Sequence, residues 1–154
     1  REPAVSLACL LTRAQYGMES PPVHVEAHVG GGLPTFTVVG LPEAVVRESR
    51  ERVRAAIQTA GLPFPQGRIT INLAPAEFPK EGGRYDLPIA LGLLAAQGIV
   101  PAAAFDGVEL YGELSLSGAL QPIRGALPAA YHATRAGHAV VLPYANAAEA
   151  RLVE

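Results

Sequence analysis

A loop of charged and glycine residues, followed at once by an apolar helix, is the part of this sequence best suited to chemistry. It spans residues 79–98 and reads P-K-E-G-G-R-Y-D-L-P-I-A-L-G-L-L-A-A-Q-G. Lys80 and Arg84 supply positive charge, and the free N–H groups at a helix N-terminus also favour anions. The loop is therefore a candidate contact for a phosphate, a DNA backbone or a neighbouring subunit. The alternative is a tight turn before a capped helix, because the glycines do not follow the P-loop pattern.

The residues after this loop predict a helix at the centre of the fold. We expect Asp86 to be its N-cap, because its carboxylate can accept an N–H group of the first turn. Pro88 falls in that turn, where a missing N–H costs nothing. Apolar side chains then occupy every side of the helix, which predicts that it is buried. Gly98 supplies the left-handed residue that ends it.

Three arginines on an earlier predicted helix form a second candidate site. Arg47, Arg50 and Arg54 are spaced by three and four residues, so they share one helix face and could contact DNA phosphates. Acidic residues four positions from an arginine favour instead an ordinary salt-bridged solvent face. The pairs are Glu43–Arg47, Glu48–Arg52 and Arg47–Glu51. A contact between subunits of a ring is a third use for the same face.

Metal, disulfide and base-stacking sites are not predicted. His24, Glu26 and His28 share one face of a predicted strand, but the sequence offers no third strong ligand, so we expect an exposed polar face and no metal. The single cysteine, Cys9, excludes an intrachain disulfide and is expected to be a buried thiol. Five tyrosines and four phenylalanines are scattered along the chain, with no evident stacking platform.

Composition predicts one globular domain over residues 1–154. The apolar fraction of 49% fits a well-buried core, and the net charge of −2 means that no overall basic field attracts nucleic acid. The apolar run at residues 4–11 is too short to span a bilayer, and we expect a cytoplasmic protein without a membrane partner.

Periodicity predicts an α+β (mixed α/β) fold with one mixed sheet, a buried central helix and flanking helices. Residues 23–29 and 34–39 are expected to pair as a hairpin across Gly30-Gly31-Gly32. The other expected strands are 4–11, 68–74, 108–113, 119–123 and 139–142. The other expected helices are 42–60, 125–136 and 146–153, with Asn146 capping the last.

Four blocks of this sequence closely resemble the ComM/YifB family, which are bacterial Mg-chelatase-like AAA+ proteins of natural transformation. The blocks are residues 32–57, 68–98, 112–130 and 140–150. The resemblance implies an N-terminal domain with the ribosomal protein S5 domain 2-like fold, shared with the Lon proteolytic domain. It also implies that an AAA+ module follows, which would bind ATP and Mg²⁺. The whole protein would then be a hexameric helicase that drives branch migration of DNA.

The Lon comparison predicts a domain without protease chemistry. Lon-type proteases carry P-K-D-G-P-S-A-G, whose serine is the nucleophile; residues 79–82 match its opening, but residues 83–86 hold no Ser, Thr or Cys. The lysine that serves as base in Lon falls at Leu127, and Lys80 is the only lysine in the chain. A serine without a base is a weak nucleophile. The alternatives are a peptidase that uses Ser115 or Ser117, and an assembly domain like that of a Mg-chelatase subunit.

Overall fold

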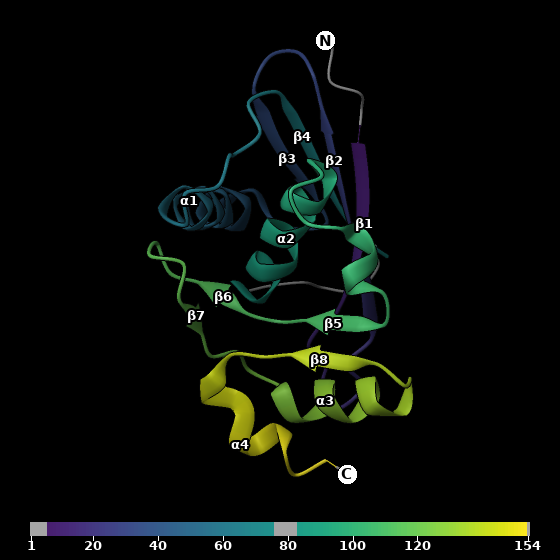
Figure 1. Ribbon diagram of the computed structural model, residues 1–154. Helices are drawn as coiled ribbons and strands as arrows, with labels where there is room; N and C mark the ends of the chain where they lie inside the picture. Colours follow the sequence, from purple (N-terminus) through teal and green to yellow (C-terminus); the bar gives the residue numbers. More distant parts are fainter. Residues whose placement is uncertain (1–5, 76–82, 154) are drawn as a thin grey trace.

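A six-stranded mixed sheet and a separate two-stranded ribbon form the framework of the molecule (Figure 1). The computed structural model describes residues 6–75 and 83–153. The sheet has the order β3-β4-β2-β1-β5-β8. Its strands are β1 (Ser6–Arg13), β2 (Pro22–Gly30), β3 (Thr35–Val39), β4 (Arg68–Ala74), β5 (Val108–Leu110) and β8 (Ala139–Val141); the ribbon pairs β6 (Glu113–Leu114) with β7 (Leu120–Gln121). The helices are α1 (Glu43–Thr59), α2 (Asp86–Ala96), α3 (Ala126–Arg135) and the short α4 (Ala147–Ala150). The expected mixed α+β fold is confirmed.

Helices α1 and α2 cover one face of the sheet. The sequences of the strands explain which of the two faces is covered. Side chains on a strand alternate between faces. In β2 and β4 the alternate apolar residues are buried in the core beneath these helices. The buried set is Val23, Val25, Ala27, Ile69, Ile71 and Leu73. The intervening residues, among them His24 and Thr70, lie on the opposite face of the sheet.

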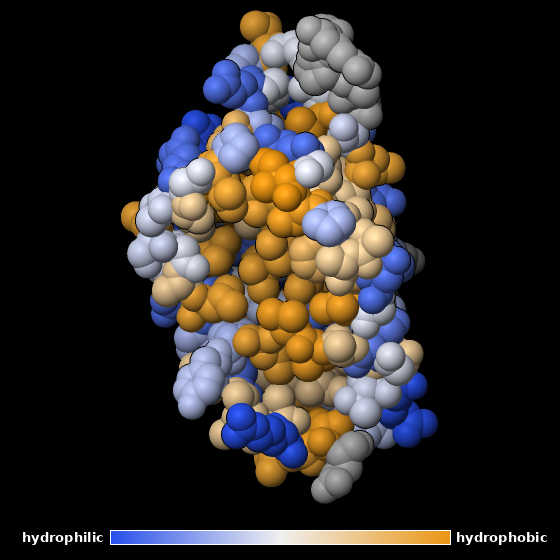
Figure 2. All heavy atoms as spheres, in the orientation of Figure 1, coloured by the Kyte–Doolittle hydropathy of each residue, from blue (hydrophilic) through white to orange (hydrophobic). Residues whose placement is uncertain are grey.

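Helix α2 is the centre of the fold, as its composition predicts. Nine of its eleven residues are buried, and only Leu87 and Leu91 are half-buried. Figure 2 shows apolar side chains gathered down the middle of the face on which α2 lies. Gly98 has a φ of +77°, and the N–H of Ile99 donates to the carbonyl of Leu94 at 2.9 Å. This is the Schellman pattern, so the predicted glycine stop is confirmed.

The predicted hairpin between β2 and β3 is wrong. β4 lies between them, pairing antiparallel with β2 and parallel with β3. The chain leaves β3, crosses the sheet through α1 and returns as β4, which lets α1 bury Val46, Val53 and Ile57 against the sheet. A parallel pair requires such a crossover. β4, in which buried and less buried residues alternate along the whole strand, thus lies in the interior of the sheet.

Two further expectations fail for related reasons. Cys9 is exposed and not buried, because β1 points Ala8 and Leu10 into the core and turns Cys9 to the open face. The expected strand 108–113 is broken at Tyr111 and Gly112, so that β6 leaves the sheet and pairs with β7. The framework is therefore one sheet plus a ribbon. Over residues 6–75 and 83–153, no helix is long and apolar enough to cross a membrane.

Candidate functional site

Of the four arginines of α1, Arg47, Arg50 and Arg54 share one face as predicted, and Arg52 turns toward the buried carboxylate of Asp86. Arg47 and Arg54 are exposed and Arg50 is half-buried. The Nε of Arg50 is 3.5 Å from Oε2 of Glu51. Of the three predicted i,i+4 ion pairs, only Glu48–Arg52 forms within the described part of the chain, at 3.9 Å. Exposed ion pairs of this kind contribute little to stability. The arginines of this face can therefore exchange these partners for another anionic group.

Two aromatic rings lie beside Arg50 and Arg54, which the sequence did not indicate. Phe36 of β3 and Phe64 of the loop before β4 stack with centroids 6.4 Å apart and planes inclined by 13°. The guanidinium carbon of Arg54 lies 4.8 Å from the centroid of Phe64. A shallow pocket of about 110 Å³ is lined by Arg50, Arg54 and both rings. Since the rings meet only when β3 and β4 pair in parallel, sequence spacing could not reveal them.

Asp86 is not the N-cap of α2, contrary to expectation. Helix α2 begins at Asp86 itself, Tyr85 occupies the N-cap position, and no side chain makes a capping bond there. The Asp86 carboxylate instead accepts the Oγ–H of Ser49 at 2.7 Å, Nε of Arg52 at 2.6 Å and the N–H of Leu114 at 3.0 Å. Burial raises the pKa of Asp86, and these donors oppose the rise. The residue joins α1, α2 and β6.

Arg84 is buried, with 5% of its surface exposed. Its Nη1 donates to the carbonyl of Arg124 at 3.0 Å, and its guanidinium lies 5.5 Å from the ring centroid of Tyr111. Its Nε and Nη2 have no hydrogen-bond partner among the described residues. Burial lowers the pKa of Arg84. Lys80, which the sequence analysis grouped with Arg84, lies outside the described residues. Arg50 and Arg54 of α1 line a different pocket from Arg84.

The start of α2 and the segment before α3 meet at Arg84 and Arg124. Arg84 lies within residues 83–86, where the Lon comparison would place a nucleophile. A pocket of about 280 Å³ at this junction is lined by Gln15, Gly83, Arg84, Glu113, Pro122, Ile123 and Arg124. Among these described lining residues there is no Ser, Thr, Cys, Lys or His. Leu127 lines a different, apolar groove beside α3.

The alternative serine nucleophiles lie in the turn between β6 and β7. Oγ of Ser115 is 2.8 Å from Oγ of Ser117 and accepts the N–H of Ala119 at 3.1 Å. In the portion of the chain that the structure describes, neither hydroxyl contacts a histidine, a lysine or a carboxylate. The geometry therefore offers no base that could activate them.

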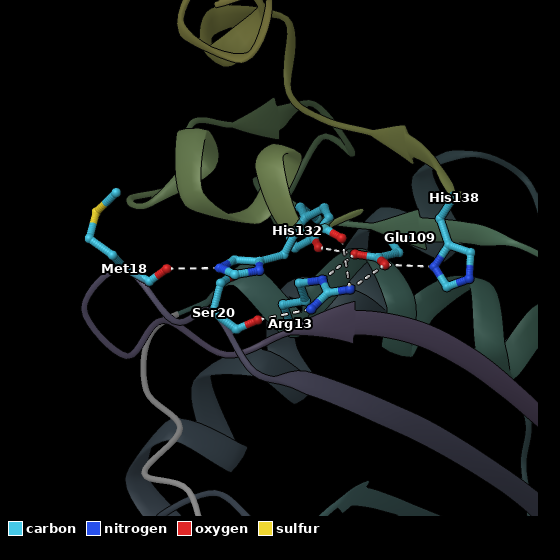
Figure 3. Close-up of polar contacts among 7 residues, drawn as sticks. Arg13, Met18, Ser20, Glu109, His132 and His138 are labelled. Atoms are coloured by element: carbon cyan, nitrogen blue, oxygen red, sulfur yellow. Dashed lines mark hydrogen bonds and ion pairs between the residues drawn. The ribbon is translucent and has the colours of Figure 1, made fainter. Parts of the chain in front are cut away.

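A buried ionic cluster around Glu109 was missed by the sequence analysis (Figure 3). Arg13 binds Glu109 through two nitrogens, at 2.8 and 3.0 Å, and His138 Nδ1 lies 2.7 Å from the same carboxylate. The hydroxyl of Tyr111 also donates to it. Burial alone would raise the pKa of Glu109, but these hydrogen bonds outweigh burial and hold it below its usual value. A lone glutamate within the apolar run V-E-L was the available signal, since buried charges need partners.

This cluster holds the second half of the sheet together. Arg13 ends β1, Glu109 lies in β5 and His138 directly precedes β8. Arg13 also donates to the carbonyls of Ser20 and His132, at 3.1 and 3.4 Å. Every guanidinium nitrogen of Arg13 is thus engaged, and the cluster is structural.

Two of the three residues weighed as metal ligands, His24 and Glu26, have other contacts. The side-chain amide of Asn72 donates to Oε1 of Glu26 at 2.7 Å, and Nδ1 of His24 lies 3.8 Å from Sγ of Cys9. Outside residues 1–5, 76–82 and 154, no group of three or more His, Cys, Asp or Glu side chains could hold a metal ion.

These features define a mixed α+β domain with a buried arginine, Arg84, at the junction between α2 and α3. The family model described as subunit ChlI of Mg-chelatase matches residues 25–146. The match covers most of the chain, which therefore belongs to this family.

Curated proteins that are similar in sequence to this chain include YifB and ComM. YifB of Salmonella typhimurium is 52% identical over 149 residues, 97% of this chain and 29% of that protein. Competence protein ComM of Haemophilus influenzae is 45% identical over 149 residues, again 97% and 29%. Lon protease of Chloroflexus aurantiacus is 31% identical over 132 residues, 80% of this chain and 16% of that protein. The resemblance to ComM/YifB is confirmed, and the chain spans less than a third of the length of these relatives.

Proposed function

We propose that this chain is the N-terminal domain of a ComM-like AAA+ DNA helicase of the cytoplasm, and that it binds single-stranded DNA without catalysing a reaction itself. The observation that carries DNA binding is the cluster of Arg50, Arg54, Phe36 and Phe64 on one surface. ATP and Mg²⁺ would be bound by an AAA+ module outside these residues. The whole protein would form a hexameric ring and drive branch migration, as the similarity to ComM suggests.

The chemistry of this surface suits a single strand better than a duplex. Aromatic rings stack on unpaired bases, and arginines beside them neutralise the phosphates. Phe36 and Phe64 are half-buried and stack on one another, and the guanidinium of Arg54 lies over Phe64, so a base that stacks on that face of Phe64 has to displace Arg54. In a duplex the base faces are stacked on one another and cannot contact the rings. A duplex would therefore be bound through the arginines alone. Because the chain has a net charge of −2, binding must come from this local patch.

Absence of catalysis in this domain is supported by the junction between α2 and α3. The described lining residues of that pocket include no Ser, Thr or Cys that could act as a nucleophile and no Lys or His that could act as its base, and the Glu113 carboxylate has no hydroxyl or thiol there to activate. Ser115 and Ser117 contact each other and not a base. A fluorophosphonate probe tests this part of the proposal: stoichiometric labelling of the folded chain would contradict it.

Anisotropy of fluorescently labelled DNA tests the binding surface. We expect single-stranded DNA to bind more tightly than a duplex of the same length, with an affinity that falls as salt rises. Arg54→Ala and Phe64→Ala should each weaken binding. Arg135→Ala is the matched control, because Arg135 also lies over an aromatic ring, that of Tyr131, but on α3.

The outcome also separates DNA binding from ring assembly. If the chain binds no DNA at low salt, the DNA role fails and the α1 face is left as a candidate subunit contact. Sedimentation of the full-length protein with Arg47→Glu then tests assembly, since Arg47 is exposed and outside the aromatic pocket. Loss of the hexamer would support that use.

A further inference from the structure

Arg84 carries a charge that no carboxylate of residues 6–75 and 83–153 compensates. Its residue surface is 95% buried, yet no carboxylate lies within ion-pair distance in the described structure, and only Nη1 makes a hydrogen bond. A buried charge without a partner is costly, and natural proteins pair such groups or remove them. The ring of Tyr111, 5.5 Å away, offers a cation–π contact but accepts no conventional hydrogen bond from the two remaining nitrogens. A guanidinium kept in this state points to a ligand.

The pocket beside Arg84 has the size and shape to admit a small group. Its volume is about 280 Å³, and Gly83 forms part of its wall. A Cβ atom on Gly83 would lie 2.4 Å from Oε1 of Glu113, so only glycine allows the Glu113 side chain to lie against the backbone here. Arg124 and Gln15 are exposed at the rim, and Pro122 and Ile123 add apolar surface.

We propose that this pocket binds a carboxylate group through the Nε and Nη2 edge of Arg84. These two nitrogens form the planar fork that matches the two oxygens of a carboxylate. Neither is in contact with solvent. Binding therefore includes a small turn of the guanidinium toward the pocket, and Arg124 at the rim adds a second positive charge.

The lining favours a carboxylate over a phosphate. Glu113 places a negative charge in the same pocket, which repels a phosphate dianion more than a carboxylate monoanion. Pro122 and Ile123 suit the apolar body of an organic acid. A DNA backbone is disfavoured on the same grounds, and also because Arg84 is buried. The carboxylate can come from a free organic acid or from the C-terminus of a peptide, and this inference does not depend on DNA binding.

Nuclear magnetic resonance of the chain labelled with ¹⁵N-arginine tests the proposal directly. The Nε–H resonance of Arg84 is identified by its absence in Arg84→Met. We expect it to shift and saturate with sodium acetate or with N-acetyl-dialanine, but not with sodium chloride at the same ionic strength or with the dialanine amide. Tighter binding of the peptide than of acetate would identify a chain terminus as the source, and the reverse a free acid. Arg135→Gln should leave the titration unchanged.

Thermal unfolding supplies the second readout. Arg84→Met removes the unpaired charge, so we expect its Tm to be higher than that of the parent chain without acid and insensitive to acetate. Arg84→Lys keeps the charge but loses the fork, and should weaken acetate binding at least tenfold. A parent titration that does not saturate overturns the proposal. Acetate binding that Arg84→Lys leaves unchanged also overturns it, whether or not Arg84→Met folds.

Discussion

Arg52 on α1 and Asp86 at the start of α2 form the closest ion pair between two helices of this chain's described structure, with Nε 2.6 Å from Oδ2. Asp86 is fully buried and Arg52 keeps 20% of its side chain exposed. Ser49, one turn earlier on α1, donates to the other carboxylate oxygen. The pair joins α1 to α2 beside the apolar contacts that both helices make in the core, and Arg50 and Arg54 lie on the same helix as Arg52.

We expect Asp86→Ala to lower the free energy of unfolding by about 3–5 kcal/mol, because it strips Arg52 and Ser49 of their buried acceptor. Urea unfolding monitored by circular dichroism measures the loss. Glu48→Ala is the matched control, since it removes the exposed partner of the same arginine at 3.9 Å. Its effect should stay near about 0.5 kcal/mol. Equal effects of the two substitutions would contradict the assigned role of Asp86.

Glu109 should make the fold sensitive to acid. Its pKa lies below the ordinary value of 4.5, through hydrogen bonds from Arg13, Tyr111 and His138 that outweigh burial. A carboxyl group whose pKa is lower in the folded state contributes stability above its unfolded pKa and loses it as pH falls through the folded pKa. We expect unfolding free energy to decline below about pH 4.5 partly through Glu109. Glu109→Gln should be less stable at pH 7, with a shallower decline.

Chemical denaturation at a series of pH values between neutral and strongly acid conditions measures this dependence. Glu43→Gln, on an exposed residue of the first turn of α1, is the control and should keep the slope of the parent chain. If Glu109→Gln declines as steeply as the parent below pH 4.5, the cluster does not carry the acid sensitivity.

Short sequence patterns predicted most of the helices and strands. The sequence could not show which strands and which charged residues pair, because those pairs join residues far apart in the chain. The end of α2 at Gly98 follows from one glycine and its neighbours, and is confirmed. The hairpin failed because alternation in residues 34–39 marks a strand but not its partner, which the α1 crossover decides. Arg13 and Glu109 are 96 positions apart, so no spacing rule pairs them.

The candidate sites followed the same division. The charge of Arg84 and its place before α2 were predictable, but its burial depends on the approach of α3 through the carbonyl of Arg124. Asp86 was expected to bond to its own helix because a carboxylate there usually does. Donors from α1, 37 positions earlier at Ser49, compete successfully for it.

Cys9 should react slowly with alkylating reagents even though it is exposed. Burial of part of the thiol and the nearby charge of Glu26, its cross-strand partner, raise the pKa of Cys9, and the thiolate is the reactive form. Glu26→Gln should speed alkylation by iodoacetamide at pH 7.5 several-fold, as followed by mass spectrometry. Glu19→Gln, on an exposed loop residue, should leave the rate unchanged. A slower reaction in Glu26→Gln would reverse the assigned sign.

Gly92 in α2 should resist a substitution that usually stabilises helices. Replacing glycine by alanine within a helix gains about 1 kcal/mol from propensity. Here the added Cβ would lie 3.0 Å from Cβ of Ala27 on β2, a strand paired on both sides. We therefore expect Gly92→Ala to lower the free energy of unfolding by about 1–3 kcal/mol through overpacking.

A double-mutant cycle separates this crowding from any other effect of the new methyl group. Ala27→Gly removes the opposing Cβ, so it should cost less in the Gly92→Ala background than in the parent chain. Urea unfolding of the parent chain, the two single variants and the double variant gives the coupling free energy. We expect the double variant to be more stable than the sum of the two single effects predicts, because the contact of Gly92 with Ala27 is the closest one at that position. Additive effects would mean that α2 moves away from β2 as a body. A stabilised Gly92→Ala would mean that the sheet yields, and that close approach of α2 to β2 is not what requires glycine here.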